Sequence, residues 1–247
     1  MIVSFFEEYP TEKNLSKLKL IKFPTKLYIA AESIDAFYKI KDKIKARNVK
    51  YVIYWPLLKK EEGYWMSPFS DSKALKRVME EAKDVVLLWD AELPFRRSLL
   101  LKNLIYFRKN KKLIKEFFIK HKKEVYCAES FPEKGLLYKL LKFLGIEFNS
   151  IECGGYEVKM LYSSMHGFSK DFIKKEIEEG KAASGDKFIP AFGVLAKGAK
   201  GDENIISKAI LERDLRIAKQ AGVKEVIVFR LGGITKEYAG ILKKYSK

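Results

Sequence analysis

Two carboxylates stand one residue apart at the end of an apolar run. Residues 85–95 read VVLLWDAELPF, in which Val85 to Trp89 is typical of a buried strand and leads directly to Asp90 and Glu92. Because side chains alternate along a strand, the two carboxylates are expected to face the same way, about 7 Å apart along the chain. Like charges on one buried face are costly unless they are used, so this pair is the first candidate for chemistry.

Paired carboxylates suit the cleavage of a glycosidic bond. One group stays protonated and donates its proton to the leaving oxygen, while the other stays ionised and stabilises the oxocarbenium-like state. The two roles therefore predict Glu92 and Asp90 as catalytic residues. The structural alternative is that Asp90 or Glu92 forms an ion pair with Arg96 or Arg97 just downstream.

Strand-like and helix-like segments alternate along the chain that carries this pair. Eight strands within 247 residues predict one (β/α)8 TIM barrel, with a single domain spanning 1–247. An open doubly wound sheet is the main rival, but no glycine-rich fingerprint follows the first strand. The predicted strands are 2–7, 27–32, 51–57, 85–90, 125–129, 157–163, 188–194 and 225–231. The predicted helices are 34–46, 72–83, 133–144, 169–181, 203–221 and 236–246, with a short one in 11–20.

Cap residues mark the ends of several of these helices. Ser72, Ser169 and Thr235 stand where N-caps are expected, and Gly145 and Gly222 stand where helices should stop.

In a (β/α)8 barrel the active site lies at the carboxyl ends of the strands. Acidic residues close four of the eight predicted strands, and the first of these ends in both Glu7 and Glu8. For a single acid the alternative is a role at the entry of the next helix, as for Glu32 before Ser33. The loop 61–71, EEGYWMSPFSD, adds aromatic rings that either stack on sugar faces or pack down on the barrel rim. The predicted substrate-binding residues are Glu7, Glu32, Trp55, Tyr64, Trp65, Glu129, Tyr162 and Arg230.

The Asp-x-Glu at the end of the fourth strand resembles the chitinase-like glycoside hydrolases of family 18. Their strand 4 carries D-x-x-D-x-D-x-E, and the resemblance implies that Glu92 is the acid and that Asp90 orients the acetamido group of the substrate. MLYS at 160–163 is similar to the family's strand-6 M-x-Y-D, which implies that Tyr162 contacts the acetamido group.

The chain also departs from this family at several positions. Val85 and Leu88 stand where the two earlier strand-4 aspartates are found, and Ser163 replaces the strand-6 aspartate. The eighth strand ends in Phe229-Arg230-Leu231 without the family's tryptophan. The resemblance therefore implies a glycosidase-like barrel rather than a defined chitinase.

A basic segment follows the carboxylate pair directly. Residues 96–123, RRSLLLKNLIYFRKNKKLIKEFFIKHKK, contain eleven Lys and Arg against one acid, Glu116, with apolar residues at helical spacing. This segment predicts a helix or a helix pair that binds an anionic membrane surface or an acidic polymer. The alternative is a solvated face with ordinary barrel packing behind it.

Composition narrows the partners and the compartment. The formal net charge of +17 favours anionic partners, but no zinc-finger or RNP-type motif predicts sequence-specific nucleic-acid binding. The two cysteines, Cys127 and Cys153, are predicted to be buried thiols. The chain shows no signal peptide and no membrane-spanning run. We therefore expect a cytoplasmic protein, with peripheral membrane association left open.

The single glutamine, Gln220, and the abundance of Lys and Glu suit a thermophile. No motif predicts a cofactor or a metal, although an all-carboxylate magnesium site stays open as an alternative.

Two other functions compete with a hydrolase. Lys159 lies in VKMLYSSMHGF, which is similar to the strand-6 lysine segment of deoxyribose-phosphate-type aldolases, and the glycine-bearing loops 196–204 and 230–237 would hold a phosphate. A non-catalytic barrel that binds a glycan or a lipid headgroup is the third reading. The sequence favours an enzyme of the glycoside hydrolase type acting on a glycan or glycoconjugate.

Overall fold

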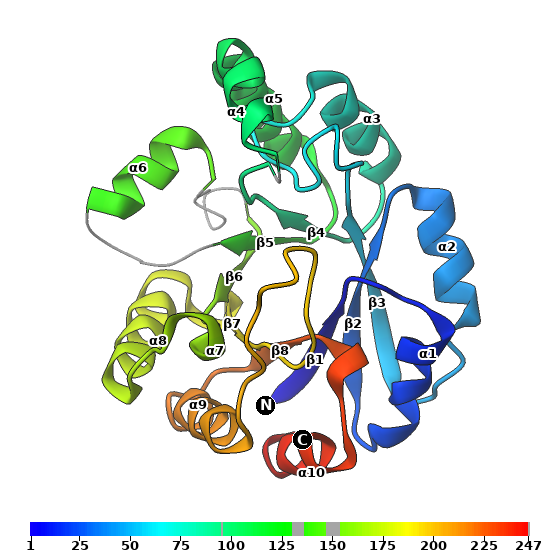
Figure 1. The fold of residues 1–247 in the computed structure, drawn as a ribbon, viewed down its shortest axis with the longest axis vertical. Coiled ribbons are helices and arrows are strands. Elements are labelled where there is room, and N and C mark those ends of the chain that lie inside the picture. Colours follow the sequence, from blue (N-terminus) through cyan, green and yellow to red (C-terminus); the bar gives the residue numbers. More distant parts are fainter. Residues whose placement is uncertain (95, 130–135, 147–153, 247) are drawn as a thin grey trace. The chain divides into compact units, whose positions relative to one another are not determined.

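The computed structural model describes residues 1–247 except 95, 130–135, 147–153 and 247. Eight parallel strands close into a barrel in the order β1 to β8, and strands alternate with helices along the chain (Figure 1). The predicted (β/α)8 fold is therefore confirmed. The strands are β1 (Ile2–Glu7), β2 (Thr25–Ala31), β3 (Val49–Pro56), β4 (Leu87–Asp90), β5 (Val125–Glu129), β6 (Tyr156–Met160), β7 (Phe188–Gly193) and β8 (Glu225–Phe229).

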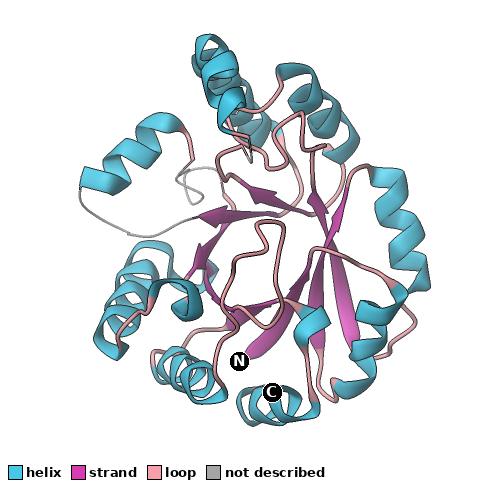
Figure 2. Ribbon diagram, in the orientation of Figure 1, coloured by secondary structure: helices cyan, strands magenta, loops and turns pink. Residues whose placement is uncertain are grey.

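Helices connect these strands, as the colouring of Figure 2 shows. The α-helices are α1 (Glu12–Leu15), α2 (Ile34–Lys43), α3 (Ser72–Ala82), α4 (Arg97–Asn103), α5 (Phe107–Lys120), α6 (Leu136–Leu144), α7 (Ser163–His166), α8 (Lys170–Ser184), α9 (Lys208–Gln220) and α10 (Lys236–Tyr245). Short 3-10 helices are η1 (Ser16–Leu20), η2 (Leu104–Tyr106), η3 (Gly185–Lys187) and η4 (Leu231–Gly233). Within the described residues, no helix is long and apolar enough to cross a membrane.

The chain divides into two compact units. Unit one comprises Met1–Ala30, Lys39–Ile53 and Lys159–Lys247, and unit two comprises Ala31–Tyr38 and Tyr54–Val158. In unit one, β1 pairs with both β2 and β8, and β7 pairs with β8. In unit two, β4 pairs with β3 and β5. The prediction of a single domain stays a prediction.

The predicted element boundaries agree best where the sequence alternates cleanly. The strands 2–7 and 125–129 are found with the predicted bounds. The sixth strand ends at Met160 rather than at Ser163, because Ser163 begins α7 and Tyr162 accepts the first turn's hydrogen bond from Met165 N. The predicted helix 133–144 is described only as α6, since 133–135 lie outside the described residues.

Helix caps explain where several helices begin and end. Ser169 and Thr235 accept hydrogen bonds from the first turns of α8 and α10, as predicted. The predicted N-cap Ser72 is wrong, because Asp71 accepts from Lys73 N and Ala74 N while Ser72 is the first helical residue. The helix stops predicted at Gly145 and Gly222 are confirmed, and both residues have positive φ, 71° and 72°.

The first connection and the basic segment take the predicted forms. Residues 11–20 fold into the short α1 and η1, which Thr11 caps by accepting from Asn14 N. Residues 96–123 form a helix pair, α4 and α5, joined by η2. Cys127 is buried on β5, as predicted, whereas Cys153 lies outside the described residues.

Close packing of helix on sheet in unit one gives a direct test of the fold. A Cβ on Gly180 of α8 would overlap the ring of Phe188, which is buried at the start of β7. A Cβ on Gly240 of α10 would have no neighbouring atom within 4 Å. Both glycines lie in helices, where alanine gains up to about 1 kcal/mol of intrinsic helix propensity.

We therefore expect opposite effects from the two matched substitutions. Gly180→Ala should lower the free energy of unfolding by about 1–3 kcal/mol, because the added methyl group overfills a packed contact. Gly240→Ala should leave it unchanged or raise it. Thermal or denaturant unfolding measures both, and a stable Gly180→Ala protein would show that α8 does not pack on Phe188 in this way.

Candidate active site

Asp90 ends β4 on the face that looks into the barrel. Its neighbour Trp89 packs edge-on against Phe118 of α5, with ring centroids 5.0 Å apart, so Trp89 faces the helix layer. Because side chains alternate along a strand, Asp90 faces the opposite side, the interior. The Asp90 side chain is buried, at 3% exposure.

Trp55 also lies on the interior face, level with Leu88 of β4, two residues before Asp90. Its neighbour Tyr54 contacts Phe37 of α2, with ring centroids 5.1 Å apart, and therefore faces outward. Tyr54 is in register with Leu87, so the inward Trp55 lies next to the inward side of β4. Unit two thus places two of the predicted site residues, a buried carboxylate and a buried indole, on the interior faces of neighbouring strands.

Glu92 lies just beyond this strand. Since β4 ends at Asp90, Glu92 belongs to the irregular stretch that follows, and its side chain is partly exposed. The backbone carbonyl of Asp90 accepts a hydrogen bond from Met66 N, 2.8 Å away, so the loop 61–71 crosses the end of β4. The same-face geometry predicted for Asp90 and Glu92 as strand residues stays a prediction.

The aromatic loop is packed inward rather than turned to solvent. Tyr64 and Trp65 are both buried and form an edge-on pair with ring centroids 5.0 Å apart. Phe69 stacks on Phe107 of α5 at 5.6 Å and an interplanar angle of 2°. The loop therefore forms a packed cover, the alternative considered for it, and the predicted contact of Tyr64 and Trp65 with substrate stays a prediction.

Two buried asparagines of the basic segment hold this loop. Asn103 Nδ2 donates to the carbonyl of Phe69 at 2.7 Å, and Asn110 Nδ2 donates to the carbonyls of Pro68 and Ser70. The asparagines stand seven residues apart, two helical turns, on the side of the segment that faces the loop. The sequence signal for this contact is the spacing of the two asparagines among apolar residues.

The other two acids of unit two do not join Asp90. Ala128 is the register partner of Asp90, so alternation places Glu129 on the helix-facing side together with Cys127. Glu32 follows β2 and is exposed, and Ser33 beside it caps the next helix by accepting from Ala36 N at 3.2 Å. Glu32 thus lies at a helix entry, the alternative considered for it.

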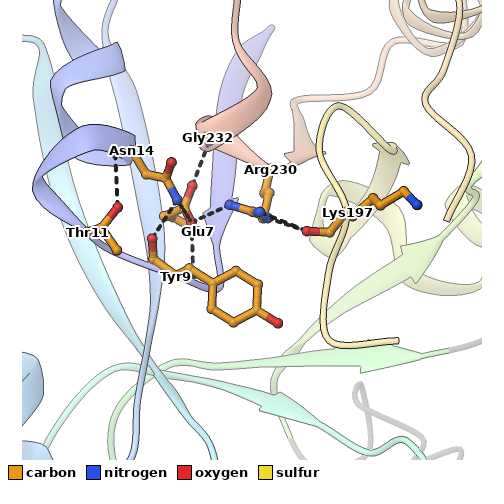
Figure 3. Close-up of polar contacts among 7 residues, drawn as sticks. All are labelled: Glu7, Tyr9, Thr11, Asn14, Lys197, Arg230 and Gly232. Carbon is orange, nitrogen blue, oxygen red and sulfur yellow. Dashed lines mark hydrogen bonds and ion pairs between the residues drawn. The ribbon is translucent and has the colours of Figure 1, made fainter. Parts of the chain in front are cut away.

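In unit one, Glu7 is the centre of a buried polar cluster (Figure 3). Its Oε1 accepts from Arg230 at 2.9 Å, from Tyr9 N at 2.8 Å and from Asn14 Nδ2 at 3.2 Å, and its Oε2 accepts from Gly232 N at 2.6 Å. Burial raises the pKa of Glu7 above its ordinary value, while the charge of Arg230 and the hydrogen bonds act to lower it. The predicted site residues Glu7 and Arg230 are therefore brought together, but as partners of one another.

Arg230 also fixes a loop that follows β7. Its Nε and a terminal nitrogen donate to the carbonyl of Lys197 at 3.0 and 2.7 Å, and its guanidinium lies over the ring of Tyr9. Leu195 N donates to the carbonyl of Phe229, which ties the start of the same loop to the end of β8. With these donors engaged, Arg230 acts as a clamp between β8 and the loop.

Glu8, rather than Glu7, lies on the interior side of unit one. Phe229 contacts Phe6 at a ring-centroid distance of 6.2 Å, and both lie on the face opposite the helix-packed Phe188. A Cβ on Gly198 would lie 2.8 Å from Glu8 Oε2, 2.9 Å from Phe229 Cζ and 3.0 Å from Glu203 Oε1. The buried carboxylates of Glu8 and Glu203 thus reach the same spot beside an inward ring.

This acid pair was missed by the sequence analysis. Glu8 was noted at the end of the first strand but not chosen. Glu203 was predicted to begin the helix 203–221, whereas α9 begins only at Lys208 and Glu203 lies in the loop before it. The alternation of β1 was the available signal, because Ser4 and Phe6 share a face with Glu8. No group of three or more acidic, histidine or cysteine side chains that could hold a metal ion is found among the described residues.

The two residues Tyr162 and Ser163, which follow β6, make contacts in different directions. The ring of Tyr162 contacts that of Phe229, with centroids 5.7 Å apart, so Tyr162 lies toward the interior side of unit one. Ser163 Oγ donates to Asp214 of α9 at 2.7 Å, and Arg213 Nε donates to the same carboxylate. Burial raises the pKa of Asp214, and these two hydrogen bonds act to lower it. The serine that replaces the family's aspartate therefore ties α7 to α9.

Solved structures resemble this chain over nearly its whole length, whereas no protein-family model and no curated protein sequence matches it. The glycoside hydrolase domain of PgaB (BpsB) from Bordetella bronchiseptica is 11% identical, with a TM-score of 0.57 and coverage of 100% of this chain and 98% of that chain. A GH18 chitinase from Pseudoalteromonas aurantia is 9% identical, with a TM-score of 0.58 and coverage of 99% and 100%. The spore cortex-lytic enzyme SleL from Bacillus cereus is 9% identical, with a TM-score of 0.57 and coverage of 100% and 74%. The predicted likeness to chitinase-like barrels is thus confirmed for the fold.

The Glu7–Arg230 pair makes a prediction about stability and pH. Arg230→Met should lower the free energy of unfolding by about 3–5 kcal/mol near neutral pH, because it leaves a buried carboxylate without its cation. Losing Arg230 also raises the pKa of Glu7 in the folded state further above its ordinary 4.5. A raised folded pKa gives stability at low pH that is lost as the pH rises, so the deficit of the variant should shrink by about pH 5.

Denaturant unfolding at the two pH values measures this difference. In the double variant Arg230→Met, Glu7→Gln the difference between the deficits at the two pH values should disappear, since the carboxyl of Glu7 is no longer there to titrate. Lys244→Met, which removes an exposed ion pair with Glu212, should cost less than about 1 kcal/mol at either pH. An equal deficit for Arg230→Met at both pH values would mean that Arg230 does not act through the charge of Glu7.

Proposed function

We propose that the chain is a glycosidase-like hydrolase that acts on a glycan or glycoconjugate, with Glu92 as the proton donor and Asp90 as its carboxylate partner. The observation that carries the proposal is the position of Asp90, a buried carboxylate at the carboxyl end of β4, on the interior face, which the neighbouring strand's Trp55 shares. Active sites of (β/α)8 barrels lie at this end of the strands. Glu92 follows two residues later and is partly exposed, so that a substrate oxygen can reach it.

Each residue then has a separate role. Glu92 donates a proton to the leaving oxygen of the scissile glycosidic bond. Asp90 in turn stabilises the positive charge that develops on the sugar or on its acetamido group. The indole of Trp55 offers an apolar plane for the face of a sugar ring.

The named structural neighbours support a carbohydrate as the substrate. One is a chitinase, one is a glycoside hydrolase domain and one is a spore cortex-lytic enzyme. Their likeness to this chain is one of fold, so the proposal for this chain depends on Asp90 and Glu92 and is tested on those residues.

The proposed role of Glu92 as the proton donor can be tested by substitution. Glu92→Gln should lower the hydrolysis of natural oligosaccharides by about 10²–10⁴-fold, because the leaving oxygen no longer receives a proton. Aryl glycosides with acidic phenol leaving groups need little protonation, so the variant should keep much more of its activity on them. The control Glu116→Gln removes an exposed carboxylate of α5 and should leave both activities unchanged.

Rates are measured on a panel of oligosaccharides and aryl glycosides, together with the melting temperature of each variant. The melting temperature of Glu92→Gln should stay within a few degrees of the wild type, because the side chain is partly exposed. Full activity with a strongly lowered melting temperature would assign Glu92 to a structural role and sink the proposal.

The aldolase alternative, in which Lys159 forms a Schiff base, can be tested directly. Lys159 is fully buried on β6, at 0% exposure, so a substrate carbonyl has no open path to its amine. Incubation with small aldehydes and borohydride should therefore leave Lys159 unmodified by mass spectrometry, although exposed lysines react. A stoichiometric adduct at Lys159 would establish Schiff-base chemistry in place of hydrolysis.

A further inference from the structure

The α4–η2 stretch presents large apolar side chains to solvent. Leu101 is 77% exposed and Ile105 is 78% exposed, and Leu104 and Tyr106 beside them are also exposed. The same stretch buries Leu99 and Asn103 against the rest of unit two. The exposed side chains therefore belong to an element that is already packed on its other side.

The helix α6 adds a second apolar row. Leu136 is 85% exposed, and Leu140 and Phe143 are both at least half exposed. These three residues are spaced by four and three positions, so they lie on one face of the helix. Two separate elements of unit two thus leave rows of large apolar side chains uncovered.

Contacts between α5 and α6 join the two rows. The rings of Phe107 and Phe143 are 6.0 Å apart, and Lys111 Nζ donates to the carbonyls of Lys142 and Phe143 at 2.9 and 2.8 Å. Because Phe107 directly follows η2, the row of α4–η2 meets the end of α6 at this contact. We call the combined surface the apolar ridge, formed by Leu101, Leu104, Ile105, Tyr106, Leu140 and Phe143.

The segments that carry the apolar ridge are basic. The segments 96–115 and 136–146 contain no Asp or Glu at all. Exposed cations stand between the apolar positions on each element, and they are Lys102, Arg108, Lys109, Lys112, Lys139 and Lys142. An uncovered apolar surface of this kind marks an interaction site, and its charge requires an anionic partner.

We propose that the apolar ridge is a membrane-docking surface that inserts into the interface of an anionic lipid bilayer. Aliphatic side chains enter the boundary between headgroups and acyl chains, Tyr106 lies at the level of the headgroups, and the flanking lysines reach the phosphates. A nucleic acid would satisfy the cations but would leave Leu101 and Ile105 against phosphates, so it fits the surface less well. The proposal does not depend on the hydrolase activity.

Vesicle binding tests the proposal with the whole protein. The wild type should bind vesicles of phosphatidylcholine that contain phosphatidylglycerol and should bind pure phosphatidylcholine vesicles far more weakly. Each cation near the surface strengthens binding through a field that salt screens within about 8–10 Å. Binding at low salt should therefore weaken steeply by about 0.5 M salt. Binding that ignores lipid charge and salt would contradict the proposal.

Two sets of variants separate the apolar and the charged contributions. Leu101→Ser with Ile105→Ser should weaken binding to anionic vesicles by at least about tenfold, because two inserting side chains are lost. Lys102→Glu with Lys109→Glu and Lys112→Glu should weaken it at low salt and reduce its salt dependence. Lys111 is left in place in this variant because it holds α6.

Matched controls come from unit one and from helices outside the ridge. Tyr51→Ser with Ile205→Ser removes two exposed apolar side chains elsewhere and should leave binding unchanged. Lys39→Glu with Lys175→Glu and Lys224→Glu makes the same change in net charge at scattered exposed positions and should have a much smaller effect. Equal losses in the control variants would reduce the result to net charge and overturn the assignment of the ridge.

Insertion itself is followed with one added, solvent-facing tryptophan. The three native tryptophans are buried, so Tyr106→Trp places the one solvent-facing indole of the described chain in the ridge. Its emission should shift to the blue when anionic vesicles are added and should stay unchanged with neutral vesicles. The oligomeric state is measured in parallel by light scattering. No shift, or a dimer that Leu101→Ser with Ile105→Ser converts to a monomer, would overturn membrane docking and assign the ridge to self-association.

Discussion

The buried Glu7–Arg230 pair is the constraint on which the end of unit one depends. Glu7 ends β1 and Arg230 follows β8, so their 2.9 Å contact joins the first and last strands of the chain. The remaining oxygen of Glu7 accepts from η4, Asn14 adds α1, and the other donors of Arg230 fix the carbonyl of Lys197. Five chain segments thus converge on one carboxylate and one guanidinium. Because Glu7 is buried, losing either partner of the pair would be costly.

Because the carboxylate of Glu7 is bound by Arg230 and by the first turns outside the barrel, Glu8 is the acid of this strand end that lies on the interior side. Glu8 approaches the inward ring of Phe229 and the same spot as Glu203, while the clamp of Arg230 on Lys197 positions the loop that carries Glu203. A similar division occurs in unit two, where Asp90 faces the interior and Glu129 falls on the other face. Acidic residues at strand ends therefore serve two purposes in this protein. Some join secondary elements and others line the interior. The alternation of side chains along the strand determines which face each acid lies on.

This division marks the limit of what could be predicted from the sequence. The barrel followed from the alternation of apolar runs and amphipathic segments, and β1 and β5 were predicted to the residue. Which of two adjacent acids faces inward depends on which face the helices cover, and that appears only when Phe188 and Trp89 are seen against α8 and α5. For the rings of Tyr64 and Trp65 the sequence left two alternatives open, stacking on a sugar or packing down on the barrel rim. Their burial depends on Asn103 and Asn110, which lie about forty residues further along the chain. Long-range hydrogen bonds of this kind leave no local pattern.

The basic segment connects the candidate site with the outer surface of unit two. Its inner side supplies Asn103 and Asn110 to the loop that crosses the end of β4, and its outer side carries Leu101, Leu104 and Ile105. Asn103 and Leu104 are adjacent residues, so an interaction that fixes the outer side also fixes the donor that holds the loop. The loop in turn donates from Met66 N to the carbonyl of Asp90. A surface that binds the apolar ridge would therefore act, through three consecutive contacts, on the strand end where the proposed chemistry takes place.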